Sequence, residues 1–122
     1  KSKNNVSSAP ILPSKQDNKL YQYFNVNKNY VKICVNDILY IESVKDYLKI
    51  VTINQSINTK AKMSDLEPTY KLNQIIRIHR SFMINLNHIA SFNHNEIFIA
   101  NQSFPIGRQY KEAVNKVLSE LV

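Results

Sequence analysis

From Tyr21 onward, short apolar segments alternate with polar breaks that are rich in asparagine. Apolar runs of about four to seven residues, bounded by turn-forming residues, are typical of β-strands. The continuous apolar run at 38–41 is typical of a strand that is buried on both faces. We therefore expect strands at 21–26, 30–35, 38–41, 47–53, 56–61, 75–78, 89–93, 96–100 and 103–106.

Three segments depart from this pattern and are expected to be helical. Residues 63–72 predict a short helix with Ser64 as its N-cap, distorted by Pro68. Residues 81–85 are expected to form a single helical turn. After Gly107, apolar residues at helical spacing predict a C-terminal helix that packs one face on the sheets; they are Tyr110, Val114, Val117, Leu118 and Leu121.

These elements divide the chain into two parts. Residues 1–20 have no periodicity and contain scattered serines, prolines and charges, so we expect a flexible linker there. Residues 21–122 are long enough to form one domain with its own core. Strands this short, with turns this frequent, predict a mostly β domain, either a sandwich or a set of small sheets.

The chain is basic, with 16 Lys and Arg against 9 Asp and Glu, a net charge of +7. A basic surplus favours a polyanionic partner such as nucleic acid or an acidic membrane surface. No apolar stretch approaches the roughly 18 residues of a membrane span, so no membrane association is expected. A single cysteine rules out an internal disulfide, which fits a cytoplasmic protein.

Catalytic chemistry has little support in the sequence. Gly107 is the only glycine, so the chain has no glycine-rich phosphate loop. His79, His88 and His94 do not form a metal-ligand pattern with Cys34. No hydrolase signature is present. We therefore expect no enzyme activity, no metal and no cofactor.

The arginines are better candidates for function. Only three of the 16 basic residues are arginine, namely Arg77, Arg80 and Arg108. The arginine fork binds guanine O6 and N7 together, which lysine does only as a point charge. Arg80 follows a strand, and Arg108 lies where a strand ends and the last helix begins. Lys111, one turn beyond Arg108, is suited to a phosphate, whereas Arg77 is best explained as half of a surface ion pair.

Four segments, in order along the chain, resemble the LytTR DNA-binding domain family. They are Ile38–Glu42 (ILYIE), Asp46–Ile50 (DYLKI), Arg77–Asn85 (RIHRSFMIN) and Phe104–Tyr110 (FPIGRQY). The resemblance implies an elongated fold of several small antiparallel sheets with short helices. It also implies binding of double-stranded DNA by loops that enter successive major grooves.

Most members of this family are output domains of bacterial response regulators. The resemblance therefore implies an upstream receiver domain, regulation of transcription in the cytoplasm, direct-repeat DNA sites and a possible dimer on DNA. Gly107 departs from the family, many of whose members have serine at this position. The glycine removes a possible hydroxyl contact to phosphate and frees the backbone.

The resemblance also assigns roles by position. The loop after Glu42 and two arginines are expected to contact bases; these residues are Lys45, Asp46, Tyr47, Arg80 and Arg108. Ser81, Lys111 and Lys49 are expected to contact phosphates. His79 is expected to shape the loop and Asn85 to tie it through its amide, with Ile78 and Phe82 as core anchors. Which residue of the loop after Glu42 reads bases stays open.

Two alternatives remain from the sequence. A binder of single-stranded nucleic acid would stack bases on exposed aromatic residues over a charged groove. Tyr40, Phe82, Phe92 and Phe104 lie in apolar runs and are expected in the core, which leaves Tyr21, Tyr23, Tyr30 and Tyr47 for stacking. The second alternative is a basic protein-interaction module, for which DNA affinity would be weak and indifferent to sequence.

Overall fold

The computed structural model describes residues 20–122, and the linker expected over residues 1–20 lies, except for Leu20, outside the described residues. Two helices are present in this part of the chain, α1 (Met63–Lys71) and α2 (Lys111–Ser119). The strands are β1 (Tyr21–Val26), β2 (Asn29–Cys34), β3 (Ile38–Val44), β4 (Tyr47–Thr52), β5 (Ser56–Thr59), β6 (Ile75–His79), β7 (Phe82–Asn85), β8 (Ser91–Phe92), β9 (Glu96–Ile99) and β10 (Gln102–Pro105).

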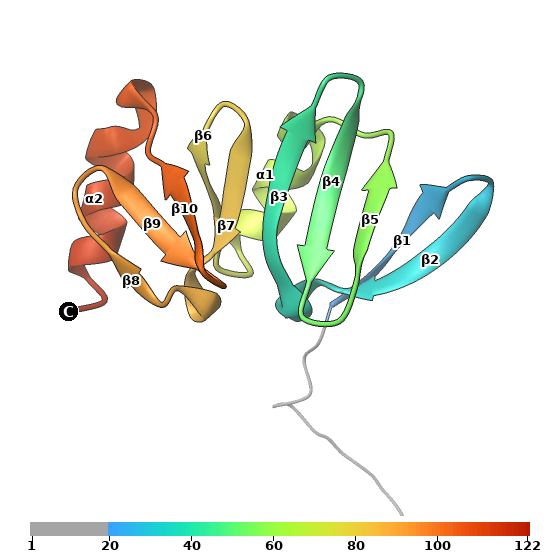
Figure 1. The fold of residues 1–122 in the computed structure, drawn as a ribbon, viewed down its shortest axis with the longest axis horizontal. Helices are drawn as coiled ribbons and strands as arrows, with labels where there is room; N and C mark the ends of the chain where they lie inside the picture. Colours follow the sequence, from blue (N-terminus) through green and yellow to red (C-terminus); the bar gives the residue numbers. More distant parts are fainter. Residues whose placement is uncertain (1–19) are drawn as a thin grey trace, which may run out of the picture.

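The strands form three antiparallel sheets that lie side by side along the length of the molecule (Figure 1). The central sheet has the order β5-β4-β3-β7-β6, the hairpin β1-β2 lies at one end, and the sheet β10-β9-β8 lies at the other. Helix α1 lies behind the central sheet and α2 behind the three-stranded sheet. The predicted mostly β fold of small antiparallel sheets, with a C-terminal helix, is confirmed.

The inner strands β3 and β7 of the central sheet are largely buried on both faces, which explains the continuous apolar run in β3. Neighbouring strands place Ile41, Ile50 and Met83 in register on one face, and these residues belong to the first core. On the other face, Tyr40 and Ile84 pair in register and belong to the second core. The first core is closed by the hairpin and α1, and the second by the three-stranded sheet and α2; their buried contributors include Phe24, Leu66, Tyr70, Ile97, Phe104 and Leu118.

The helical turn predicted at 81–85 is wrong, because this segment forms β7. Met83 faces the first core and Ile84 the second, and both residues are fully buried. A strand that is apolar on both faces lacks the alternation by which strands are recognised in a sequence. Pairing with β3 and β6 on either side therefore decided the conformation.

Helix α1 has its N-cap two residues earlier than the predicted Ser64. Met63 is the first helical residue, and Lys62 occupies the N-cap position without a side-chain cap. Met63 is buried in the first core while Ser64 is exposed, so packing outweighs capping at this end. Pro68 lies inside the helix as expected, where it removes one backbone hydrogen bond.

Three hydrogen bonds anchor the hairpin β1-β2 and the residue before it to the rest of the domain. The Tyr70 hydroxyl in α1 donates to Gln22 Oε1 at 2.6 Å, and burial raises the pKa of Tyr70 well above its usual range. The Thr59 hydroxyl in β5 donates to the carbonyl of Asn25 at 2.9 Å. The carbonyl of Leu20 accepts from Val35 N at 2.8 Å, so the domain already includes Leu20.

Candidate nucleic-acid interface

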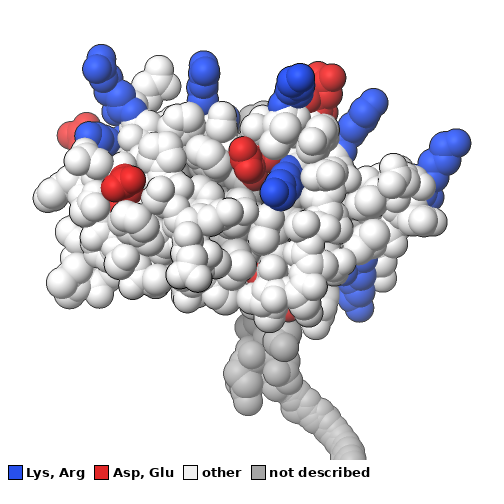
Figure 2. Space-filling view, viewed as in Figure 1, with Lys and Arg blue, Asp and Glu red and all other residues white. Residues whose placement is uncertain are grey.

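Basic residues gather on one edge of the molecule, the upper edge in Figure 1. The connections there carry Lys28 (β1–β2), Lys45 (β3–β4), Lys60 and Lys62 (β5–α1), Arg80 (β6–β7) and Arg108 (β10–α2). On the opposite edge, the connections 53–55, 86–90 and 100–101 contain no Lys or Arg. Most of the Lys and Arg visible in Figure 2 project from the upper edge, which is therefore a basic edge suited to a polyanion.

The β3–β4 turn is the first predicted contact segment, and it is shorter than the sequence predicted. A loop from Glu42 to Asp46 was expected, but β3 continues to Val44 because Glu42 pairs with Lys49 and Val44 with Tyr47. Only Lys45 and Asp46 form the turn, and both are exposed. Lys45 has a φ of 51°, a left-handed conformation that is uncommon outside glycine and asparagine.

The same pairing separates the remaining predicted residues of this region. Tyr47 is half-buried as the first residue of β4, beside the turn. Lys49 lies two residues further along β4, half-buried on the face of the sheet and opposite Glu42. The turn and Tyr47 therefore lie on the basic edge, whereas Lys49 belongs to the adjoining face of the sheet.

The β6–β7 turn presents Arg80 and Ser81. The register of the two strands shifts between Arg77 and His79, and the turn follows directly. The backbone N–H of Ser81 donates to His79 Nδ1 at 3.0 Å. The Arg80 side chain is exposed. The turn is thus held by its own histidine and directs the arginine into solvent.

Arg77 supports this turn in a way that the sequence did not indicate. Its expected surface ion pair is confirmed, with Nη1 lying 3.4 Å from Glu67 Oε1 in α1. In addition, Arg77 Nη2 donates to the carbonyl oxygen of Arg80 at 2.8 Å. The two bonds join α1 to the turn through one guanidinium. No sequence spacing reports such a contact, because Glu67 and Arg77 lie in different elements.

The third segment joins β10 to α2 and presents Arg108. Gly107 N donates to the carbonyl of Ile78 at 2.7 Å, which fixes the segment against β6. Gly107 has a φ of −64°, so it uses no conformation reserved for glycine. Its advantage is close approach, because an added Cβ would lie 3.2 Å from the Tyr110 ring and 3.4 Å from His79. Arg108 is exposed at the first residue of a 3₁₀ turn.

Lys111, the first residue of α2, is half-buried rather than free in solvent. Its ammonium donates to Asn95 Oδ1 at 2.7 Å, in the β8–β9 turn. This contact positions the charge beside the segment that carries Arg108. A partner phosphate would have to share or replace the Asn95 oxygen.

Backbone hydrogen bonds link the three segments to one another. Ser43 N, near the end of β3, donates to the carbonyl of Ser81 at 2.8 Å. Together with the bond from Gly107 to Ile78, this contact connects both neighbouring segments to the β6–β7 region. The segments are far apart in the sequence but lie on the same edge (Figure 1).

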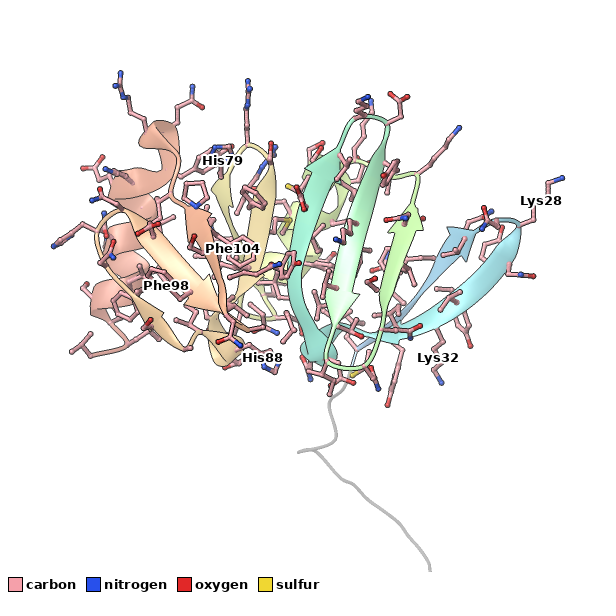
Figure 3. The ribbon with its side chains drawn as sticks, in the orientation of Figure 1. Lys28, Lys32, His79, His88, Phe98 and Phe104 are labelled. Carbon is pink, nitrogen blue, oxygen red and sulfur yellow. The ribbon has the colours of Figure 1, made fainter. Side chains whose placement is uncertain are left out.

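A chain of aromatic rings lies beneath the β6–β7 turn. The centroids of His79 and Phe82 are 5.4 Å apart, those of Phe82 and Phe104 are 5.3 Å apart, and those of Phe104 and Tyr40 are 4.5 Å apart. Figure 3 shows His79 near the basic edge and Phe104 within the body. The chain of rings therefore connects the turn to the second core, to which the fully buried Ile78 also belongs, as expected.

Asn85 was expected to tie the β6–β7 turn through its amide. It does not, because it lies at the opposite end of β7. Its side chain is fully buried, and Nδ2 donates to the carbonyls of Ile38 at 2.8 Å and Asn36 at 3.3 Å. Its Oδ1 accepts from Asn87 N at 2.9 Å. The amide therefore joins the start of β3 to the segment after β7, on the edge away from the basic residues.

Comparison with known families bears directly on this arrangement. The model of the LytTr DNA-binding domain family matches residues 28–119, which include all three segments of the basic edge. The chain belongs to this family. The resemblance drawn from the four sequence segments is thereby confirmed.

Two curated relatives of this LytTr domain are sensory transduction proteins of Bacillus species. The "Sensory transduction protein LytT" of Bacillus anthracis is 27% identical over 99 residues, and the match covers 76% of this chain and 40% of that protein. The protein of the same name from Bacillus cereus matches with the same identity and coverage. The chain thus spans well under half the length of these relatives.

A solved structure shows the same fold. A LytTr DNA-binding domain of Bacillus cereus superimposes with a TM-score of 0.69 at 19% identity, covering 80% of this chain and 95% of that one. Within residues 20–122 of the present LytTr domain, no helix is long and apolar enough to cross a membrane. No group of three or more His, Cys, Asp or Glu in the same range is arranged to hold a metal ion.

Proposed function

We propose that this LytTr domain binds double-stranded DNA in a sequence-specific manner and thereby regulates transcription. The observation that carries the proposal is the uneven charge of the two edges, because the basic connections all project from one of them. Three linked loops on one edge suit a duplex, whose grooves accept projecting side chains while its phosphates bind lysine and arginine.

Within this proposal, Arg80 and Arg108 read base edges. Both guanidinium groups are exposed at the ends of structured turns, so a duplex can reach them without unfolding the domain. A bidentate arginine contact to guanine is the commonest specific contact in the major groove. The β3–β4 turn contributes a second reading position through Lys45, Asp46 and Tyr47. Among these three residues, the exposed positive charge of Lys45 favours it for the base contact.

Phosphate contacts then fix the position of the domain on the duplex. Ser81 directly follows Arg80, and Lys111 lies three residues after Arg108, so both residues are suited to contact phosphates beside the two arginines that read bases. Lys49 reaches the backbone only if the duplex also covers the face of the sheet beside Tyr47. His79 shapes the β6–β7 turn by accepting the amide of Ser81, so its part in binding is indirect.

The longer relatives are named sensory transduction proteins. By analogy, we propose that the domain is the output module of a response regulator, connected through residues 1–20 to a receiver domain and acting in the cytoplasm. Binding as a dimer to direct repeats agrees with this role, because two domains on one face of a duplex need half-sites about one helical turn apart.

A single-strand binder is the alternative with a specific observation in its favour. Tyr21, Tyr23 and Tyr30 are 48, 60 and 71% exposed. The pairing of Tyr23 with Lys32 and of Asn25 with Tyr30 places these tyrosines on the outer face of the hairpin. They nevertheless lie in the hairpin, outside the three linked segments, and Tyr40 and Phe104 are buried as expected.

Competition between duplex and single-stranded DNA separates the two functions. Unlabelled duplex should displace a fluorescent duplex far more effectively than either of its single strands does. In addition, log K should fall linearly with log salt, by about 0.9 for each phosphate contacted. Preference for the single strands, measured by fluorescence anisotropy, would contradict the duplex proposal and favour the tyrosine face.

A further inference from the structure

We infer that the DNA-binding edge continues beyond the β3–β4 turn into a lysine-lined groove between the hairpin β1-β2 and β5. The groove would bind the sugar-phosphate backbone of duplex DNA that flanks the recognised sequence. This inference rests on the proposed function and adds a contact segment, the hairpin, to the three already described.

The groove is open, and its lining consists of Asn, Thr, Tyr and Lys residues without a carboxylate. It has a volume of about 460 Å³, and its lining includes Asn25, Asn27, Lys28, Tyr47, Asn58 and Lys60. Ammonium groups and side-chain amides are donors that contact phosphate oxygens without reading the sequence. A chain of phosphates would meet two cations and several amide donors here.

The two lysines carry free charges. Lys28 and Lys60 are both exposed. Within residues 20–122, the salt bridge of Arg77 with Glu67 is the only one, so neither lysine has a carboxylate partner in that range. Binding a phosphate here therefore breaks no existing ion pair, and it releases counterions as other phosphate contacts do.

The tip of the hairpin is held in a fixed conformation. Asn27 and Lys28 have φ angles of 52° and 70°, and the backbone N–H of Lys28 donates to Asn25 Oδ1 at 3.0 Å. The Thr59 hydroxyl binds the carbonyl of Asn25 and so joins the hairpin to β5. These two residues form the two-residue turn between β1 and β2, and hairpin turns of this length favour a left-handed conformation, so the turn itself holds Lys28 in place.

The groove is continuous with the edge already described. Tyr47 lines it and also lines the neighbouring groove that contains Lys45 and Lys62. Figure 3 shows Lys28 at the end of the hairpin on the side of the basic edge, whereas Lys32 points away from the opposite side. A duplex lying along the edge therefore meets Lys60 and Lys28 after the β3–β4 turn.

The test compares Lys28→Ala/Lys60→Ala with the wild-type domain on duplexes of different length. A charge-matched control, Lys32→Ala/Lys116→Ala, also removes two exposed lysines, at positions outside the groove. Each protein is titrated against three duplexes. One is trimmed to the recognised bases, and the other two are extended by about ten base pairs on one side or the other. Circular dichroism verifies that all three proteins are folded.

We expect the groove variant to lose about tenfold in affinity near 0.15 M salt on one of the extended duplexes, and its salt slope to fall by about 2. On the trimmed duplex it should match the control. Equal loss on trimmed and extended duplexes, or no loss beyond the control, would overturn this inference while leaving the proposed function intact. Failure of the wild-type domain to bind any duplex would instead overturn the proposed function itself.

Discussion

Replacing Arg80 and Arg108 together by alanine is expected to weaken binding to a specific site by about 2–6 kcal/mol, a loss of roughly 30-fold or more. Each arginine is exposed on its own segment, so the two losses, about 1–3 kcal/mol apiece, should add. The measurement is a titration of the double variant and both single variants against a specific duplex and a random duplex, at one salt concentration.

Lys111→Ala provides the matched control, because it removes one positive charge next to Arg108 without removing a reading side chain. It should weaken binding to specific and random duplexes alike and lower the salt slope by about 1. The arginine variants should instead lose affinity mainly for the specific duplex, so that the difference in affinity between the specific and the random duplex becomes smaller. If they weakened binding to both duplexes equally, they would be phosphate contacts and their assignment as base readers would be wrong.

Phe104→Ala is expected to destabilise the domain by about 3–5 kcal/mol. Phe104 is 3% exposed and its ring contacts those of Tyr40 and Phe82, so truncation empties the space between the central and three-stranded sheets. Since a domain of this size is stable by only about 5–15 kcal/mol, the variant should unfold at much lower urea concentration.

Phe98→Ala is the control for this loss, because Phe98 lies in β9 of the same sheet but is only half-buried. It should cost clearly less than Phe104→Ala in the same urea titration followed by circular dichroism. A loss below about 1 kcal/mol for Phe104→Ala, or equal losses for the two variants, would contradict the role of the aromatic rings in joining the sheets.

The strands were largely predictable because most of them expose one face or end at a clear turn. The segment 81–85 was not, since both faces of β7 are buried and the sequence alone offers no alternation. The predicted length of the β3–β4 turn was wrong for a related reason. Glu42 and Ser43 are polar residues that look like loop, but they pair with Lys49 and Leu48 inside the sheet.

Some features of the candidate site could likewise be predicted from the sequence, and others could not. Arg80 and Arg108 stood out in the sequence because arginine is rare in a lysine-rich chain. Their position on one edge depends on hydrogen bonds between distant backbone atoms, such as Ser43 with Ser81, which no spacing encodes. The support that Arg77 gives to Arg80, and the groove beside Lys28, likewise arise only when separate elements come together.

Selection of bound sites from a pool of random duplexes shows whether this domain reads a DNA sequence. The wild-type domain should enrich a defined motif, repeated about one helical turn apart if two domains bind one face of the duplex. Enrichment should vanish for the Arg80→Ala/Arg108→Ala variant while weak binding to the unselected pool remains. A wild-type domain that binds the pool but enriches no motif would contradict sequence-specific binding.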